Sequence, residues 1–405
     1  MRIAMISEHA SPLATLGRVD AGGQNAHVAE LSTALAQLGH QVRVYTRRDD
    51  PVLPPFVNMG DGVDVVHVPA GPPKQIPKDD LLPYMSDFGR WLLDQWRTGD
   101  WAPDVAHAHF WMSGLATLTA ARQVDLPVVQ TYHALGSVKR RHQGTADTSP
   151  PGRIGYERAL GRAVDRVVAQ CEDEVGELIR LGVPRTQIAV IPSGVDLDKF
   201  SPAGPAAARD PSRPRILSVG RLVERKGFGE LIRAMRVVPT AECVVVGGPP
   251  AAELGADPVA RKLQDLADSA KVADRIQLVG GVPREDMPSW YRSADVLACA
   301  PWYEPFGLTP LEAMACGIPV VATAVGGLTD TVVDGLTGDL VRPRDPRALG
   351  SVLRRLLSDP MRRLAYATAA LDRARQVYSW RRCAAQLNSL YAAVTALRRP
   401  SGAVA

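Results

Sequence analysis

The sequence predicts an α/β fold built as two domains, each on a parallel sheet. Three observations lead to this prediction. Short apolar strands alternate with helical segments along the chain, several strands run into glycine-bearing or polar loops, and a proline-rich stretch at 201–214 separates two runs of this alternation. The chain of 405 residues also exceeds what one core usually supports. We therefore expect a first domain over 1–200, a linker over 201–214 and a second domain over 215–379.

The amino-acid composition argues against a nucleic-acid-binding protein and a membrane protein. Hydrophobic residues make up 46% and charged residues 22% of the chain, as in ordinary globular proteins. The net charge of +4 comes from scattered arginines without a basic block, which does not indicate nucleic-acid binding. Residues 1–7 lead straight into strand-like sequence, and no apolar run approaches the length of about 18 residues typical of a membrane helix. We therefore expect neither a signal peptide nor a membrane span.

The cysteines indicate a reducing compartment. The five cysteines stand far apart and include no Cys-x-x-Cys pair, so neither a disulfide framework nor a zinc site is indicated. We expect free thiols in the core of a cytoplasmic protein, and no metal site.

The first domain opens as a βαβ unit. A strand over 2–7 leads into a loop over 11–24, an amphipathic helix over 25–38 and a second strand over 41–46. The pair Gly22-Gly23 in the loop fits either a simple turn or a ligand-binding loop. Further strands are expected at 63–68, 104–109, 126–133, 164–169 and 187–191, which makes a sheet of about seven strands.

Two strands of this domain end in histidines, His109 and His133. In open α/β sheets ligands bind beyond the carboxyl ends of the strands, so the repetition indicates a binding site. His133 begins a polar and basic loop, and we expect it to contact a ligand. His107 lies inside its strand, and for it we expect a structural role.

The second domain opens with a strand over 215–220 and a loop that carries Arg221 and Lys226. Two cations at the carboxyl end of a strand suit a diphosphate, although a solvated basic loop would carry the same residues. Asp196-x-Asp198, just before the linker, is interpreted as a turn rather than a pair of metal ligands. Five more strands are expected at 243–248, 275–281, 294–298, 318–323 and 338–341, with a helical end over 347–396.

A helix start near Pro310 is bracketed by two carboxylates. Thr309 fits the N-cap and Glu312 follows it by three residues, which predicts a capping box. The same helix start can hold a phosphate, because it offers free backbone N–H groups and Gly307 lets a ligand approach closely. Glu304 precedes the helix in a loop that gains nothing structural from a carboxylate, so we expect it to contact a ligand. Glu312 fits a cap and a ligand contact equally well.

Two motifs resemble a known enzyme family. They are Ser218-Val-Gly-Arg-Leu-Val-Glu-Arg-Lys-Gly227 and Glu304-Pro-Phe-Gly-Leu-Thr-Pro-Leu-Glu312, the latter followed by Ala-x-Ala-Cys-Gly-Ile-Pro-Val-Val-Ala-Thr-x-x-Gly-Gly327. The chain resembles the retaining nucleotide-sugar glycosyltransferases of family four over nearly its whole length. The resemblance implies the GT-B fold: two Rossmann-like domains with a cleft between them, an active site in that cleft, and a last helix, 380–398, that joins the first domain. It also implies domain closure on donor binding, with a hinge near residue 200.

The resemblance assigns a donor site residue by residue. Arg221 and Lys226 would hold the donor diphosphate, and the backbone of Gly307, Leu308 and Thr309 would add N–H donors. Glu304 would face hydroxyls of the transferred sugar, and Glu312 would bind the ribose hydroxyls.

Two further positions come from the first domain. Gly23 matches the family's loop over the phosphate and acceptor, and His133 matches a histidine that contacts the donor sugar near C6. The catalytic candidates are therefore Glu304, Arg221, Lys226 and His133. Fixed cations and helix N–H groups should stabilise the negative charge that develops on a diphosphate leaving group, so no metal or other cofactor is required. The resemblance implies front-face attack, with the leaving phosphate taking the acceptor's proton, and no general base is assigned.

The acceptor positions implied by the resemblance are Asn25, Lys78, Phe110 and Arg153. Within the family, the chain is most similar to enzymes that transfer N-acetylglucosamine to inositol phosphate in mycothiol synthesis, and to sucrose-phosphate synthases. Where the former have a tyrosine and a threonine that help to bind the acceptor phosphate, this chain has Phe110 and Ala134, whose side chains cannot donate hydrogen bonds. This chain therefore has only part of the phosphate site of those enzymes, which allows a different polar acceptor, such as a natural-product intermediate.

The leading hypothesis is a retaining glycosyltransferase that moves a hexose-type sugar from a UDP-sugar or GDP-sugar to a small polar acceptor. The narrower alternative is the inositol-phosphate N-acetylglucosaminyltransferase itself. A lipid or polysaccharide acceptor would require an exposed amphipathic basic helix, and the basic runs at 47–48 and 139–141 are too short for one. A non-catalytic nucleotide-sugar sensor is disfavoured because both glutamates and both cations are present. The sequence leaves the oligomeric state open, a homodimer included.

Overall fold

The computed structural model describes residues 1–14 and 22–398, which form two compact units. Unit 1 holds the chain up to Ser193 and from Trp380 onward, and unit 2 holds Gly194–Ser379. The units divide after Ser193 and not at residue 200, the expected end of the first domain, because Val195 donates its N–H to the Tyr378 carbonyl and Phe200 is buried in the unit 2 core. Part of the predicted glycine loop, 15–21, lies outside the described residues.

Unit 1 is built on a sheet of eight strands within the described ranges, in the order β3-β4-β2-β1-β5-β6-β7-β8. Its strands are β1 (Arg2–Ile6), β2 (Gln41–Arg47), β3 (Phe56–Gly60), β4 (Val63–Val68), β5 (Val105–His109), β6 (Val128–Thr131), β7 (Arg166–Ala169) and β8 (Ile188–Val190). Seven of these confirm expected strands. The eighth, β3, was missed because it is a partly exposed edge strand, antiparallel to β4 and without a clear apolar alternation.

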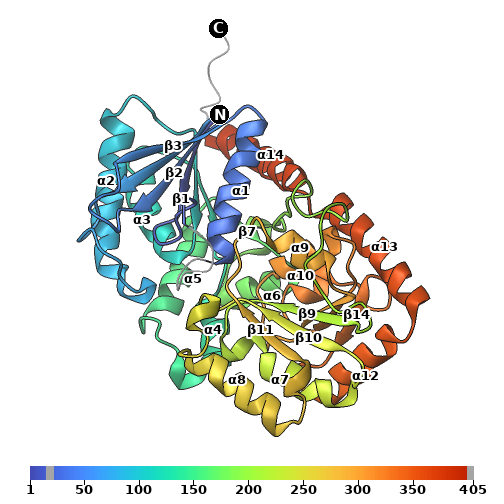
Figure 1. Ribbon diagram of the computed structural model, residues 1–405. Helices are drawn as coiled ribbons and strands as arrows, with labels where there is room; N and C mark the ends of the chain where they lie inside the picture. Colours follow the sequence, from blue (N-terminus) through green and yellow to red (C-terminus); the bar gives the residue numbers. More distant parts are fainter. Residues whose placement is uncertain (15–21, 399–405) are drawn as a thin grey trace. The chain divides into compact units, whose positions relative to one another are not determined.

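The helices of unit 1 include the last helix of the chain. They are α1 (Gly23–Gln37), α2 (Met85–Thr98), α3 (Trp111–Ala121), α4 (Gly136–Gln143), α5 (Arg153–Ala163), α6 (Glu172–Leu181) and α14 (Trp380–Arg398). Figure 1 shows α14 beside α1, and Trp380, Leu387 and Tyr391 of α14 are buried with Leu31 and Leu35 of α1 in one core. The helix expected at 25–38 is therefore confirmed, with its start two residues earlier.

Unit 2 has six strands in the part of the chain that the structure describes, all parallel, in the order β11-β10-β9-β12-β13-β14. They are β9 (Arg215–Val219), β10 (Glu242–Val246), β11 (Ile276–Gly280), β12 (Val296–Cys299), β13 (Val320–Thr323) and β14 (Gly338–Val341), and all were expected. Its helices are α7 (Phe228–Ala234), α8 (Pro258–Ser269), α9 (Met287–Arg292), α10 (Leu308–Ala315), α11 (Leu328–Thr331), α12 (Pro346–Leu357) and α13 (Pro360–Val377). Helices cover both faces, since α7 and α12 bury one set of core residues and α10 and α13 another.

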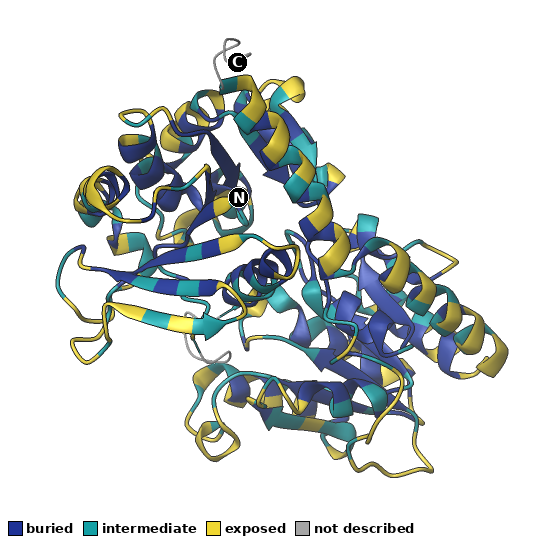
Figure 2. Ribbon diagram, turned by 90° about the horizontal axis from the view of Figure 1, so that it is seen from above, coloured by how far each residue is buried: buried dark blue, intermediate teal, exposed yellow. Residues whose placement is uncertain are grey.

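Both sheets have a point where the strand order reverses. In unit 1, β1 lies between β2 and β5, and in unit 2, β9 lies between β10 and β12. Loops that leave neighbouring strands in opposite directions open a crevice at such a point, where α/β proteins bind ligands. Figure 2 shows the strands largely buried and the outer helix surfaces exposed, so function is expected at these loop ends rather than on the sheet faces.

Two smaller expectations can be compared with the structure. All five cysteines are buried and none of them forms a disulfide, which confirms them as core thiols. Asp196 accepts hydrogen bonds from the N–H groups of Asp198 and Lys199 at 3.0 Å each, which confirms the predicted turn. Among the described residues, every helix is too short or too polar to cross a membrane.

Candidate active site

The donor-side residues of unit 2 lie on two loops that follow neighbouring strands. One loop follows β9 and the other follows β12, and Trp302 N–H joins them by donating to the Arg225 carbonyl at 2.9 Å. Gly227, with φ of 72°, makes this approach close, because a Cβ there would lie 1.8 Å from the Ala300 carbonyl oxygen. The loops can therefore hold their side chains in fixed positions.

Lys226 and Glu304 meet between these loops. The Lys226 ammonium lies 2.5 Å from a Glu304 carboxylate oxygen, and both side chains are mostly buried. Burial alone would raise the pKa of Glu304, but Lys226, Arg225 and Arg221 outweigh it and lower that pKa, so the carboxylate is ionised at neutral pH. The expectation that this loop gains nothing structural from a carboxylate is wrong, because Glu304 neutralises Lys226.

A small hollow, partly open to solvent, lies at this ion pair. It combines a cation, a carboxylate and small apolar groups. The residues that line it are Ser218, Val219, Lys226, Cys299, Ala300, Pro301, Glu304, Thr309 and Leu328. Arg221 is exposed and is not among them, although its charge acts on Glu304. The structure thus brings Lys226, Glu304 and Thr309 together and leaves Arg221 at the margin.

The start of α10 differs from the predicted capping box. The N-cap is Gly307, with φ of 91°, and no side chain caps the helix. Thr309 lies inside the first turn, with its hydroxyl 3.6 Å from the Cys299 sulfur. The capping-box prediction is wrong because glycine's left-handed conformation starts the helix at Leu308. The first backbone N–H groups, at Leu308 and Thr309, consequently have no side-chain cap and remain available to an anion.

The Glu312 carboxylate is held by two side chains of unit 2. Arg284 donates to one carboxylate oxygen at 2.8 Å and the Tyr291 hydroxyl donates to the other at 2.6 Å. Burial, and then the charge of Glu312, raise the pKa of Tyr291, so its proton stays on the hydroxyl. A carboxylate has about four acceptor positions, so Glu312 can still accept hydrogen bonds from a ligand's hydroxyls.

The histidines of unit 1 form a cluster at the carboxyl ends of β5 and β6. His107 is fully buried and bonds both Tyr391 and Thr131, at 2.6 and 2.8 Å, which confirms its structural role. His133, with φ of 60°, places its Nε2 2.9 Å from Nδ1 of His109. Burial lowers the pKa of His133 to about 3, so the ring is neutral at neutral pH.

His27, one turn into α1, completes a group that was not expected. Potential ligand atoms of His27, His109 and His133 lie within 4.8 Å of one another, and among residues 1–14 and 22–398 this is the group that could hold a metal ion. Each ring is already engaged, since His27 bonds Ser193 at 2.7 Å and the other two bond each other. We therefore interpret the cluster as a neutral hydrogen-bonded network.

The glycine loop reaches the same switch point. Gly23 is the exposed first residue of α1, and Gln24 donates to the Ser7 hydroxyl at 3.2 Å and to the His109 carbonyl at 3.3 Å. Asn25 is buried and holds the start of α1, because its side-chain oxygen accepts from Gly22 N–H at 2.9 Å. Asn25 thus has a structural role at the start of α1, and its contact with a ligand stays a proposal.

Of the remaining acceptor candidates, Phe110 and Arg153 lie beside one another in unit 1. Phe110, just after β5, is 3% exposed and has an unusual φ of 82°. Arg153, the first residue of α5, is 1% exposed and stacks over the Phe110 ring at 5.0 Å. Lys78 begins a short 3-10 helix, Lys78–Asp80, after β4.

Comparisons with known proteins decide the family. Residues 21–199 match the family model described as Glycosyltransferase Family 4, and residues 205–373 match Glycosyl transferases group 1. A D-inositol 3-phosphate glycosyltransferase of Xylanimonas cellulosilytica is 40% identical over 99% of this chain and 98% of its own length. The chain belongs to glycosyltransferase family 4. A second D-inositol 3-phosphate glycosyltransferase, of Kineococcus radiotolerans, is 39% identical over 94% of this chain and 92% of its own length.

Solved structures agree on the fold of this glycosyltransferase. Sucrose-phosphate synthase of Thermosynechococcus elongatus is 31% identical and superposes with a TM-score of 0.88, covering 98% of this chain and 99% of its own. Anabaena HepE in complex with UDP is 18% identical, with a TM-score of 0.73 over 97% of this chain and 100% of its own. The GT-B fold and the transferase class are thereby confirmed.

Several residues around the glycosyltransferase site were not predicted from the sequence. Arg284 and Tyr291 hold Glu312, and Gly327 N–H donates to the Glu304 carbonyl at 3.0 Å. Arg284 follows β11, so the rule that ligand sites lie beyond strand ends could have found it. No sequence pattern around Tyr291 indicates its role, because that role depends on the packing of α9 against α10.

Proposed function

We propose that this glycosyltransferase moves a hexose-type sugar from a nucleotide diphosphate sugar to a small polar acceptor, with retention of anomeric configuration. The observation that supports it is the Lys226–Glu304 ion pair in a hollow beside the uncapped start of α10. This arrangement combines a fixed cation, a fixed carboxylate and free N–H groups, which are the groups that a sugar diphosphate needs.

The charges indicate how the reaction is helped. Cleavage of the sugar–phosphate bond places negative charge on the diphosphate, which Lys226, Arg221 and the α10 N–H groups would stabilise. Glu304 would accept hydrogen bonds from sugar hydroxyls while its charge favours the positive character of the sugar ring. Because Lys226 already binds the Glu304 carboxylate, we assign Glu304 to positioning and electrostatics and not to nucleophilic attack. Front-face attack, with the leaving phosphate taking the acceptor's proton, is the mechanism we propose.

The donor's nucleoside is proposed to bind at Glu312. Its carboxylate would accept hydrogen bonds from the ribose hydroxyls while Arg284 and Tyr291 keep it in place. Ribose recognition does not depend on the base, so both uridine and guanosine donors belong in the test.

The experiment is a donor panel followed by product analysis. Purified protein is incubated with UDP-sugars and GDP-sugars, and nucleotide release is measured with and without polyol acceptors. We expect release from one donor class and, by NMR, a product with the donor's anomeric configuration. An inverted product would contradict the front-face mechanism. Tight donor binding without any release would instead favour a nucleotide-sugar sensor.

A further inference from the structure

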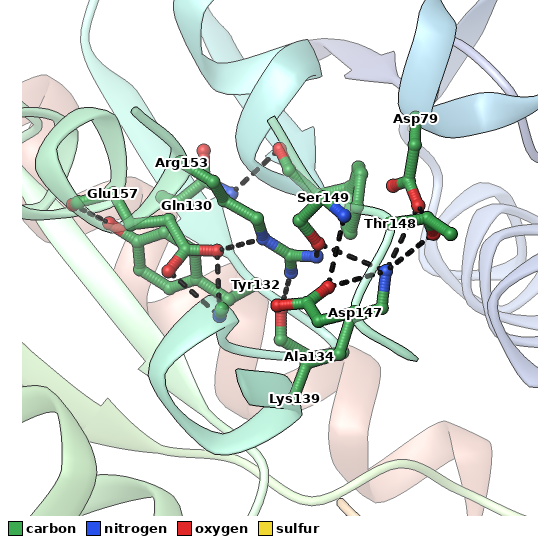
Figure 3. A network of polar contacts seen from close by, with 12 residues as sticks. Asp79, Gln130, Tyr132, Ala134, Lys139, Asp147, Thr148, Ser149, Arg153 and Glu157 are labelled. Carbon is green, nitrogen blue, oxygen red and sulfur yellow. Dashed lines mark hydrogen bonds and ion pairs between the residues drawn. The ribbon is translucent and has the colours of Figure 1, made fainter. Parts of the chain in front are cut away.

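The proposed acceptor side of unit 1 contains an internal network in which each cation is paired with a carboxylate. It lies after β4, β5 and β6 and on α4 and α5. Figure 3 shows it as one chain of polar contacts, from Glu157 and Arg153 through Ser149 to Lys139, Asp147 and Asp79. A phosphate would need donors and unpaired positive charge in this place.

All three guanidinium nitrogens of Arg153 make hydrogen bonds inside the protein. Its Nε donates to Glu157 at 2.7 Å, Nη2 donates to the Ala134 carbonyl at 2.6 Å, and Nη1 donates to the Ser149 hydroxyl at 3.1 Å. Its guanidinium also lies over the Phe110 ring. Since the side chain is almost wholly buried, a phosphate could reach Arg153 only by breaking this set of bonds.

Glu157 takes the position that an anionic ligand would take. Its carboxylate accepts the N–H of Gly136, the first residue of α4, at 2.9 and 3.0 Å to its two oxygens. A helix start next to a buried arginine is a favourable anion site, and here the protein's own carboxylate fills it. The N–H groups of Phe110 and Ala134 are also used, by the carbonyls of Thr131 and Tyr132.

Lys139 is neutralised in the same way. Its ammonium lies 2.9 Å from Asp79 and 3.1 Å from Asp147, and it also donates to Ser149 at 2.9 Å. Burial opposes ionisation of Asp79, but the bonds from Thr148 and Lys139 outweigh it and lower the pKa of Asp79. The second oxygen of Asp79 is buried and has no hydrogen-bond partner among the described residues. A carboxylate oxygen only accepts hydrogen bonds, so its charge would repel a phosphate placed nearby.

We propose that the acceptor carries no phosphate and is an uncharged polyol, because the charges of Arg153 and Lys139 are already neutralised inside the protein. This inference rests on the proposed function and specifies its acceptor class. The residues that determine it are Glu157, Asp79 and Asp147, which neutralise the cations, together with Phe110 and Ala134, whose side chains donate no hydrogen bond.

The first test compares a matched pair of probes, D-inositol 3-phosphate and inositol. Calorimetric titration measures binding, and mass spectrometry measures sugar transfer. We expect no preference for the phosphorylated compound. A preference of tenfold or more for D-inositol 3-phosphate, in binding or in transfer, would overturn the proposal. Failure of the proposed function is a separate result, in which no nucleotide sugar is turned over while the binding comparison still decides the acceptor class.

The second test removes the internal carboxylates. Glu157→Gln should free the charge of Arg153, and the double variant Asp79→Asn/Asp147→Asn should free that of Lys139 without changing the more deeply buried pair. Either variant is expected to bind D-inositol 3-phosphate at least tenfold more tightly than the wild type. Asp87→Asn, which removes an exposed ion pair with Arg90, is the matched control and should change nothing. If both folded variants bind the phosphate no better than the wild type, the carboxylates do not exclude it and the proposal is wrong.

Discussion

Among single residues, Lys226 and Glu304 are central to the proposed sugar transfer, because they form the ion pair of the donor site. The motif around each residue was visible in the sequence, because glycines and charged residues followed two strands. Their direct contact was not visible, because 78 residues separate them and only the pairing of β9 with β12 brings their loops together. His27 was missed for the same reason, since its partner Ser193 is 166 residues away.

Replacement of Lys226 tests the donor site at this scale. Lys226→Ala should lower kcat/KM for the donor by about 10²- to 10³-fold, because a fixed charge opposite the leaving group is lost. The matched control is Lys262→Ala, which removes an exposed pair with Glu224 at 3.7 Å. Steady-state kinetics should show the control unchanged. Equal losses in the two variants would mean that the effect is not specific to the site.

Tyr391 tests the structural assignment of His107. Tyr391→Phe leaves the buried Nδ1 of His107 without its partner and should lower the free energy of unfolding by about 1–3 kcal/mol. Chemical denaturation measures this change. Tyr156→Phe, on a residue that is 42% exposed, should change stability by less than about 0.5 kcal/mol. A Tyr391→Phe variant as stable as the wild type would contradict the assignment.

At the scale of elements, strands were the most predictable part of the molecule. Buried parallel strands are continuous apolar runs, so thirteen of the fourteen found in the described chain were expected, and only the partly exposed edge strand β3 was missed. Helix starts were less predictable. A Thr-Pro-x-Glu pattern indicates a cap at Thr309, but in α10 the left-handed Gly307 is the N-cap, so the helix starts two residues earlier. Glu312 is bound by Arg284 and Tyr291 instead.

Gly227 sets the distance between the two donor-site loops. Gly227→Ala should destabilise the protein by about 2–4 kcal/mol, because a strained φ combines with a clash against Ala300. Gly335→Ala is the matched control, since Gly335 has φ of 74° but no atom within 4 Å of an added Cβ. It should cost only the backbone strain, about 1–2 kcal/mol. Thermal unfolding of both variants separates the two contributions, and equal shifts would show that the close approach is unimportant.

At the scale of the whole molecule, the two units differ in their titratable groups. All eight histidines lie in unit 1, from His9 to His142, and none lies in Gly194–Ser379. Burial lowers the pKa values of His27, His107, His109 and His133, in two cases to about 3. Histidine protonation can therefore change the stability of unit 1 near pH 6 but not that of Gly194–Ser379.

Unit 1 should lose stability as pH falls below about 6.5, the ordinary histidine pKa. The unfolded chain protonates these four histidines there and the folded unit does not, so their stabilising contribution is complete above pH 6.5 and declines by up to about 1.4 kcal/mol per pH unit for each histidine. Glu174, whose pKa burial raises to about 7, binds a proton only in the folded unit and offsets about one of the four histidines. Hydrogen exchange at pH 7.0 and 5.5, corrected for the intrinsic rate, should show protection falling in unit 1 while unit 2 serves as the internal control. An equal fall in both units would contradict this explanation.

The central claim is that a sugar nucleotide's pyrophosphate binds at Lys226 and the start of α10. Calorimetric titration with a nucleoside diphosphate and with the matching nucleoside measures this most directly. We expect the diphosphate to bind the wild type at least 100-fold more tightly than the nucleoside, and Lys226→Ala to remove most of that difference while leaving nucleoside binding unchanged. Equal affinity of wild type and Lys226→Ala for the diphosphate would contradict the account.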